Sequence, residues 1–179
     1  MGRLVSDKGV DLAIRAFHRI IYTQNNKQDT SQIILTIIGD GPERTSLQNL
    51  VVELSLEKHV LFTGVLRGEE LVMCLNQHKF ILIPSRWEEP FGIVALEGMA
   101  CGCIPIASDG GGLKSAIGKA GILFQRNNLE DLVSCMKKVT EDNHLIKRFH
   151  EEIPHHLAKF HPHEISRRYL EVVESVLID

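Results

Sequence analysis

Residues 80–109 read FILIPSRWEEPFGIVALEGMACGCIPIASD, in which two short apolar runs flank a helical pattern. The run FILIPS (80–85) is apolar and contains β-branched residues, which predicts a buried strand that ends near its proline. CIPIASD (103–109) predicts a second strand, and FGIVALEGMAC (91–101) predicts a short helix between them. A strand, a helix and a strand in this order are typical of two parallel strands joined by a crossover helix.

The same alternation continues on both sides of this unit. Further strands are predicted at 33–39, 59–64 and 121–124, and further helices at 10–22, 42–56, 69–77, 128–140, 143–157 and 162–177. This order predicts an α/β fold, a Rossmann-like doubly wound parallel sheet with helices on both faces. The polar segment 23–32 is predicted to be a surface insertion, and 1–179 to be one domain.

Composition excludes several classes of protein. The chain has 179 residues, a formal net charge of -3 and a pI of about 6.3. This balance argues against nucleic acid or an anionic membrane as the main partner. No apolar run approaches the length of a transmembrane helix, and no signal peptide is expected before Gly2. We therefore expect a cytoplasmic domain.

The cysteines and histidines are the residue types that could ligate a transition metal. The four cysteines form no CxxC pair, so buried free thiols in a reducing compartment are expected. Histidines gather in HEEIPHHLAKFHPH (150–163), where a solvated helix-loop-helix is favoured over a metal site because no acids support an i, i+4 pair. No metal site is predicted.

Glycine and charged residues follow the predicted strands. In doubly wound folds the carboxyl ends of the strands form the ligand-binding edge, and helix N-termini there attract phosphate. The segments expected at this edge are GRLVSDKG (2–9), GDGPE (39–43), GVLRGEE (64–70), PSRWEEPFG (84–92) and SDGGG (108–112).

Two cations and two acids at this edge are candidates for chemistry. Arg3 and Lys8 beside a helix N-terminus could clamp a diphosphate, although their spacing alone favours two solvated surface cations. Glu89 and Glu97 could accept hydrogen bonds from sugar hydroxyls on either side of a phosphate. Alternatively, Glu89 caps the helix and Glu97 is exposed; the apolar neighbours of Glu97 argue against exposure. Glu88 is expected to be solvated.

These segments follow one another in the order and spacing of the C-terminal half of GT-B retaining glycosyltransferases. From Gly2 to about Tyr169 the chain resembles glycosyltransferase family 4, which contains sucrose, trehalose and lipopolysaccharide glycosyltransferases. The Glu-x7-Glu pattern EPFGIVALE (89–97) is weak by itself. Together with GR…KG, GDGPE and the glycine-rich turn it is a strong signal.

The resemblance implies a nucleotide-sugar donor site. Arg3 and Lys8 would hold the two phosphates, with the backbone amides that begin the helix. Glu97 would accept from the ribose hydroxyls, Glu89 from the donor sugar, and the base would lie against the loop after the strand 59–64. Arg3, Lys8 and Glu89 are the expected catalytic residues, and the expected donor-binding residues are Gly2, Gly39, Val65, Leu66, Phe91, Gly92, Ile93 and Glu97.

The implied reaction is transfer of a hexose with retention at the anomeric carbon. A front-side reaction is expected, in which the leaving diphosphate helps to deprotonate the incoming hydroxyl. UDP-glucose or another UDP-hexose is the expected donor, with GDP-mannose next. The acceptor would be a glycan, a lipid-linked oligosaccharide or a small molecule, as in polysaccharide biosynthesis. No Asp-x-Asp motif is present, so neither a metal nor another cofactor is expected.

The chain departs from the family pattern in three ways. The N-terminal acceptor-binding half is absent, so the chain is expected to bind donor or hydrolyse it slowly. The helix at 162–179 would cross back toward that half, and any membrane association would belong to the full-length enzyme. The family has a strand before GR, where Met1 stands here, and an acid where GGLKS (111–115) has Ser115.

Other functions remain open on these residues. A noncatalytic nucleotide-sugar-binding module or subunit would have the same fold but would not need the complete set of Arg3, Lys8, Glu89 and Glu97. A nucleotide-sugar epimerase fits GR…KG and EPFGIVALE poorly. A Rossmann dehydrogenase would need G-x-G-x-x-G after its first strand, which the sequence lacks.

Overall fold

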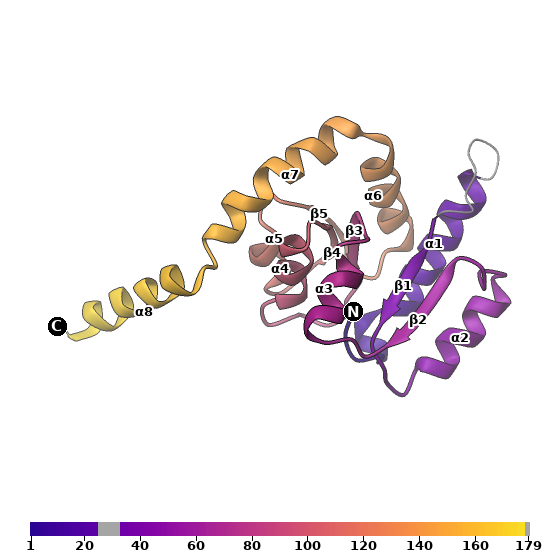
Figure 1. Ribbon diagram of the computed structural model, residues 1–179, viewed down its shortest axis with the longest axis horizontal. Coiled ribbons are helices and arrows are strands. Elements are labelled where there is room, and N and C mark those ends of the chain that lie inside the picture. Colours follow the sequence, from indigo (N-terminus) through magenta and orange to yellow (C-terminus); the bar gives the residue numbers. More distant parts are fainter. Residues whose placement is uncertain (25–32, 178–179) are drawn as a thin grey trace.

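Figure 1 presents the computed structural model of the chain, which describes residues 1–24 and 33–177. Strands and helices alternate along the chain and all paired strands are parallel, which confirms the predicted α/β class. The predicted insertion at 23–32 lies almost wholly outside the described residues.

The strands of the described residues form two sheets. β1 (Leu35–Ile38) pairs with β2 (Val60–Gly64), and β4 (Ile104–Asp109) lies between β3 (Phe80–Ile83) and β5 (Ile122–Gln125). The predicted unit of 80–109 is confirmed, because β3 and β4 are parallel neighbours joined through a helix. The structure differs from one continuous sheet, since β1 and β3 do not pair with each other.

The helices lie close to their predicted positions. The chain forms α1 (Val10–Gln24), α2 (Arg44–Glu53), α3 (Gly68–Leu75), α4 (Ile93–Ala100), α5 (Leu113–Ile117), α6 (Leu129–Glu141), α7 (Asn143–Ala158) and α8 (Pro162–Leu177), after a short 3-10 turn at Ser6–Lys8. Of these helices, α5 was not predicted from the sequence. The predicted start of α2 at Pro42 is wrong, because residues 42–43 form a turn before the helix.

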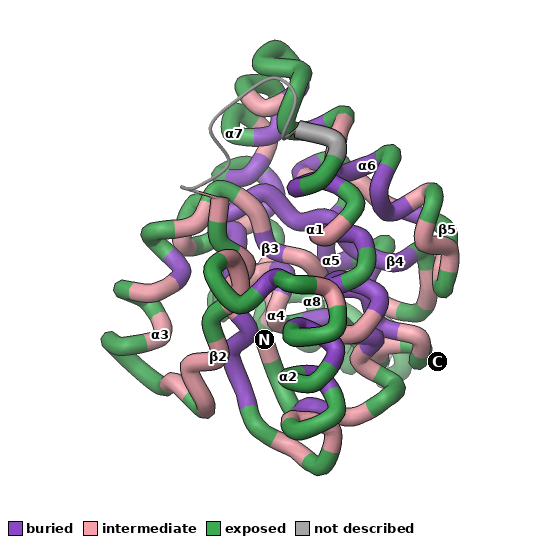
Figure 2. Tube along the Cα trace, turned by 90° about the vertical axis from the view of Figure 1, so that its right-hand side faces the viewer, coloured by how far each residue is buried: buried purple, intermediate pink, exposed green. Residues whose placement is uncertain are grey.

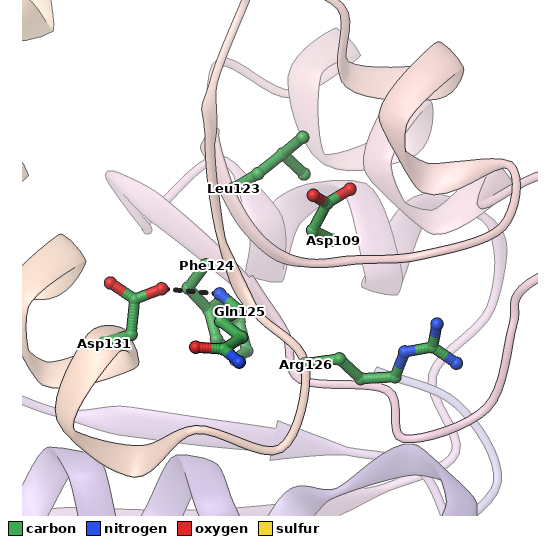
Figure 3. A pocket seen from close by; sticks show the side chains of 6 residues that line it. All are labelled: Asp109, Leu123, Phe124, Gln125, Arg126 and Asp131. Atoms are coloured by element: carbon green, nitrogen blue, oxygen red, sulfur yellow. Dashed lines mark hydrogen bonds between the residues drawn. The ribbon is translucent and has the colours of Figure 1, made fainter.

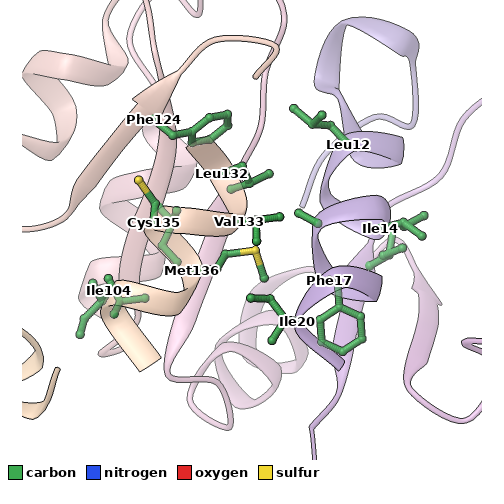
Figure 4. Packing of buried hydrophobic residues seen from close by; sticks show 14 of the residues in the cluster. Leu12, Ile14, Phe17, Ile20, Ile104, Phe124, Leu132, Val133, Cys135 and Met136 are labelled. Carbon is green, nitrogen blue, oxygen red and sulfur yellow. The ribbon is translucent and has the colours of Figure 1, made fainter. Parts of the chain in front are cut away.

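The core occupies both faces of the β3–β4–β5 sheet. Along β4, Ile104 and Ile106 belong to the cluster that contains α1 and α6, whereas Ala107 belongs to the cluster that contains α4 and α5. This alternation follows from the period of a strand, in which successive side chains point to opposite faces. Figure 4 shows the first cluster, with Leu12 and Ile20 of α1 facing α6, and Figure 2 shows the buried residues inside the layers.

The cysteines are free thiols that are not all buried. Cys103 and Cys135 are buried, as predicted, whereas Cys74 and Cys101 are only partly buried. Burial raises the pKa of the Cys103 thiol to about 11, so this group is protonated and unreactive at neutral pH.

A cavity of about 580 Å³ lies between β1 and β3. Its walls are mostly apolar side chains of β1, β3, α1 and α6. At one end it reaches charged and glycine residues of the carboxyl edge, namely Gly2, Arg3, Lys8 and Glu89. This end of the cavity contains several of the residues that the sequence singled out.

The last helix stands apart from the layers. Figure 1 shows α8 extending away from α7, with the chain end at its tip. Tyr169, Val172 and Val176 are 71%, 63% and 72% exposed, so an apolar stripe of α8 has no covering within the described residues. Among these residues no helix is both long and apolar enough to cross a membrane.

Candidate donor-binding site

The carboxyl edge is held together by backbone contacts between its loops. The amide of Gly2 donates to the carbonyl of Ile38 over 2.9 Å, and the amide of Gly39 donates to the carbonyl of Gly64 over 2.7 Å. The start of the chain, the end of β1 and the end of β2 therefore meet at one place, as predicted. Gly2 and Gly39 lie in direct backbone contact, because a Cβ on Gly39 would stand 1.8 Å from the Gly2 carbonyl oxygen.

Gly9 brings the first loop against the loop after β3. It has a φ of +62°, and a Cβ at this position would lie 2.1 Å from the carbonyl oxygen of Pro84. Only a glycine allows this approach without displacing the backbone. The contact places Lys8 next to the segment that carries Glu89.

Lys8 and Glu89 form an ion pair in this structure. The Lys8 Nζ lies 2.5 Å from the Glu89 Oε1, and the hydroxyl of Ser85 donates to the same oxygen over 2.6 Å. Glu89 therefore does not cap α4, which has Gly92 as its N-cap. One of the three donors of the Lys8 ammonium is used, so two remain for a ligand.

The electrostatics keep Glu89 ionised. Partial burial acts to raise the pKa of the Glu89 carboxyl, but the hydrogen bonds from Lys8 and Ser85 and the charge of Lys8 outweigh it, and the pKa lies below its ordinary value. Glu89 is thus an acceptor for hydroxyl groups at neutral pH rather than a proton donor.

Arg86 connects the loop 84–92 to the start of α1 through hydrogen bonds. Its guanidinium donates to both carboxylate oxygens of Asp11, each over 2.7 Å, and to the carbonyl of Ser6 over 2.9 Å. Burial opposes the charged form of Asp11, yet the hydrogen bonds and charge of Arg86 lower the pKa of its carboxyl. Neither Arg86 nor Asp11 was predicted as a site residue, although Arg86 does follow a predicted strand at the expected edge.

The glycine-rich turn after β4 supports the same loop. A Cβ on Gly112 would lie 2.4 Å from the Pro90 carbonyl oxygen, and the Gly112 amide donates to the Glu89 carbonyl over 2.7 Å. Phe91 and Gly92 follow directly and lead into α4, whose first amides are free of helical partners. The turn thus positions both Glu89 and the N-terminus of α4. Ser115 lies in α5 and is exposed.

Several predicted residues take no part in the ion pair. Arg3 lines the same end of the cavity and is exposed; its carbonyl accepts a hydrogen bond from the Val5 amide over 3.1 Å, and no described residue forms a hydrogen bond or ion pair with its side chain. Val65 is 58% exposed and Ile93 is 62% exposed. Leu66 is partly buried and packs against the α4–α5 cluster.

One expectation about the acids needs correction, and another is confirmed. Glu97 is exposed and, within the part of the chain that the structure describes, its side chain has no hydrogen-bonding or ion-pairing partner. The expectation that its apolar neighbours disfavour exposure is wrong, since Glu97 lies on the same exposed face as Ile93, one turn away. Glu88 is solvated as predicted, but it also pairs with Arg126 over 3.0 Å.

A shallow hollow at the ends of β4 and β5 lies beside this site. Figure 3 shows its lining, which contains none of the predicted donor-binding residues: Asp109, Leu123, Phe124, Gln125, Arg126 and Asp131. The Asp131 carboxylate accepts a hydrogen bond from the backbone amide of Gln125 over 2.5 Å, so it stabilises the loop before α6.

No metal-binding cluster is found in residues 1–24 and 33–177, where histidine, cysteine and acidic side chains never gather in threes at a suitable spacing. Of the histidines in 150–163, His156 is buried and its Nε2 lies 2.7 Å from the carbonyl of Ala116. The other four, His150, His155, His161 and His163, are exposed.

The fold and this edge define a glycosyltransferase domain, and sequence comparison agrees. The family described as Glycosyl transferases group 1 matches residues 1–156, so the chain belongs to this family. The chain is also 32% identical over 167 residues to D-inositol 3-phosphate glycosyltransferase of Corynebacterium jeikeium, and the match covers 89% of this chain and 39% of that protein.

Solved structures have the same fold. Sucrose-phosphate synthase of Thermosynechococcus elongatus matches 99% of this chain and 45% of its own, with a TM-score of 0.78 and 24% identity. The Anabaena protein HepE, in a complex with UDP, matches 97% of this chain and 48% of its own, with a TM-score of 0.72 and 20% identity. These matches confirm that the chain has the fold of one half of a GT-B structure.

The chain spans less than half the length of the curated relatives it matches, with coverage of 28%, 39%, 42% and 48% of four of them. It therefore corresponds to one part of those enzymes.

Proposed function

We propose that the chain is the donor-binding half of a retaining glycosyltransferase of family 4, and that it binds a nucleotide-diphosphate sugar at the carboxyl edge. The observation that carries this proposal is the Lys8–Glu89 pair, which places a cation and a hydroxyl acceptor 2.5 Å apart near the start of α4. The cation can bind a phosphate, and the carboxylate can accept hydrogen bonds from sugar hydroxyls.

The donor in this proposal is UDP-glucose or another UDP-hexose. The UDP complex of HepE supports this choice of base, and the family membership supports sugar transfer. Lys8, Arg3 and the first amides of α4 bind the diphosphate, where the helix dipole adds to their charge. Glu89 accepts hydrogen bonds from hydroxyls of the donor sugar, and Glu97 accepts them from the ribose. The base lies along Val65 and Leu66, and Gly2 and Gly39 line the floor of the site.

The proposed reaction retains the configuration of the anomeric carbon. The bond between that carbon and the diphosphate oxygen breaks while the acceptor oxygen attacks from the same face, and the acceptor proton passes to the leaving diphosphate. Arg3, Lys8 and the α4 N-terminus stabilise the charge that builds on the diphosphate. In this scheme Glu89 orients the sugar and no metal ion or other cofactor takes part.

The acceptor belongs to the remainder of the enzyme. A glycan, a lipid-linked oligosaccharide or a small molecule would bind in a second domain toward which α8 extends, and the enzyme would work in the cytoplasm, at a membrane if its acceptor is there. By itself the chain binds the donor or hydrolyses it slowly.

Substitution of the two acids tests the residue roles. Glu89→Gln should leave the affinity for UDP unchanged or higher, because it releases Lys8, and should weaken UDP-glucose about tenfold through loss of charged hydrogen bonds. Glu97→Gln should weaken UDP and UDP-glucose alike. Calorimetric titration of each variant with both ligands measures these effects.

The exposed Glu130 on α6 offers a matched control, since it lies outside the carboxyl-edge loops and Glu130→Gln should change neither affinity. Equal affinities in the wild type, Glu89→Gln and Glu97→Gln would contradict the proposed placement of the sugars.

A further inference from the structure

A row of aromatic rings connects the end of α7 with the loop before α4. The ring of Phe160 lies edge-on to Phe91, with centroids 5.7 Å apart, and edge-on to His156 at 5.1 Å. Phe91 stands directly before the N-cap of α4, and His156 and Phe160 belong to the last turn of α7 and the segment after it. The three rings span elements that are far apart in the sequence.

His156 anchors this row to the body of the domain. It is only 6% exposed, and its Nε2 lies 2.7 Å from the carbonyl of Ala116 in α5. A carbonyl can only accept, so the Nε2 carries the proton and donates. The ring also fills the space above Gly118, where a Cβ would lie 2.5 Å from its Cε1. The imidazole is therefore held by hydrogen bonding and by packing.

The side chain of Phe91 is only partly covered by the rest of the domain. It is 42% exposed, and its backbone rests on Gly112, where a Cβ would lie 2.5 Å from the Phe91 Cα. The backbone of the loop thus rests on the glycine-rich turn, and the side chain of Phe91 contacts the ring of Phe160. Edge-to-face aromatic pairs favour one relative orientation, so Phe160 restricts the positions that Phe91 can take.

We propose that Phe160, anchored through His156, is a positioning residue for the donor site: it holds Phe91 and thereby sets the position of the Glu89 carboxylate and the first amides of α4. This inference rests on the proposed function. It extends the site to the end of α7, directly before α8 begins at Pro162. A displacement of α8 would be transmitted to the diphosphate site through these rings.

The only tryptophan of the chain is a reporter for this loop. Trp87 lies between Arg86 and Glu89 and is 61% exposed. Its fluorescence anisotropy measures the mobility of the loop without any nucleotide. Phe160→Ala should lower this anisotropy and raise the dissociation constant for UDP about two- to tenfold, as expected for loss of one aromatic pair.

Phe160→Tyr keeps the ring and should restore both values, and Tyr169→Ala on the exposed face of α8 should change neither. In a double-mutant cycle, Phe91→Ala combined with Phe160→Ala should weaken UDP no more than Phe91→Ala alone. If Phe160→Ala lowers the helix content, Phe160→Leu is measured in its place, because it keeps an apolar side chain but not the ring.

The inference would be overturned if Phe160→Ala had the same Trp87 anisotropy and the same affinity for UDP as the wild type. Additive effects of the two substitutions on the affinity for UDP would overturn it as well. Failure of the wild type to bind UDP would instead contradict the proposed function, and the anisotropy of Trp87 would still decide whether Phe160 restrains the loop.

Discussion

Replacement of Gly9 by alanine should destabilise the domain by about 2–5 kcal/mol, from left-handed strain together with a backbone overlap. Gly9 has a φ of +62°, and an added Cβ would stand 2.1 Å from the carbonyl oxygen of Pro84. Neither backbone can move freely, because Arg86 ties the loop after Pro84 to Asp11 in α1. Urea unfolding of Gly9→Ala and the wild type measures the difference in free energy.

Gly68→Ala separates the effect of left-handed strain from the effect of the backbone overlap. Gly68 has a φ of +52°, but nothing lies within 4 Å of the place that an added Cβ would occupy, so only the conformational strain applies, about 1–2 kcal/mol. If Gly9→Ala and Gly68→Ala lower the free energy of unfolding equally, the close approach of Gly9 to Pro84 has no energetic importance.

Replacement of Lys8 by methionine should have the largest effect on ligand binding. The methionine keeps most of the apolar stem but removes the ammonium that we assign to the diphosphate. Hydrogen bonds to charged groups contribute about 1.5–3 kcal/mol, which corresponds to a loss of about 10- to 150-fold in affinity for UDP. The same substitution should weaken UDP-glucose to a similar extent, and calorimetric titration measures both.

The control for charge is Lys147→Met. Lys147 is 78% exposed on α7 and makes only a loose i, i+4 contact of 4.0 Å with Glu151. Its removal makes the net charge of the chain more negative by the same amount as Lys8→Met without touching the site, so the affinity for UDP should stay unchanged. An effect of Lys147→Met as large as that of Lys8→Met would point to nonspecific electrostatics.

Much of the fold follows from local sequence. The runs at 80–83 and 104–107 are apolar, short and bounded by turn residues, so their strands could be located and their parallel order inferred from the helix between them. α5 was missed because five residues, Leu113–Ile117, are too few for a helical period to be recognised. The break between β1 and β3 was also missed, since pairing between distant strands is not encoded in either run.

The site could be predicted in its location but not in its contacts. Lys8 and Glu89 were both expected at the carboxyl edge, yet they are 81 positions apart in the sequence, and it is tertiary contacts, such as the packing of Gly9 on Pro84, that bring them together as an ion pair. Arg86 was missed because its partners, Asp11 and Ser6, come from a distant segment. The exposure of Glu97 could not be inferred from helical spacing, because the residue four positions before it, Ile93, is apolar and yet exposed.

The most direct test of the proposed donor site is calorimetric titration of this chain with UDP, UDP-glucose, GDP and GDP-mannose. We expect UDP and UDP-glucose to bind, and both guanine nucleotides to bind more weakly by about tenfold or more. Binding of none of the four, or tighter binding of GDP and GDP-mannose, would contradict the assignment of the carboxyl edge as a UDP-sugar site.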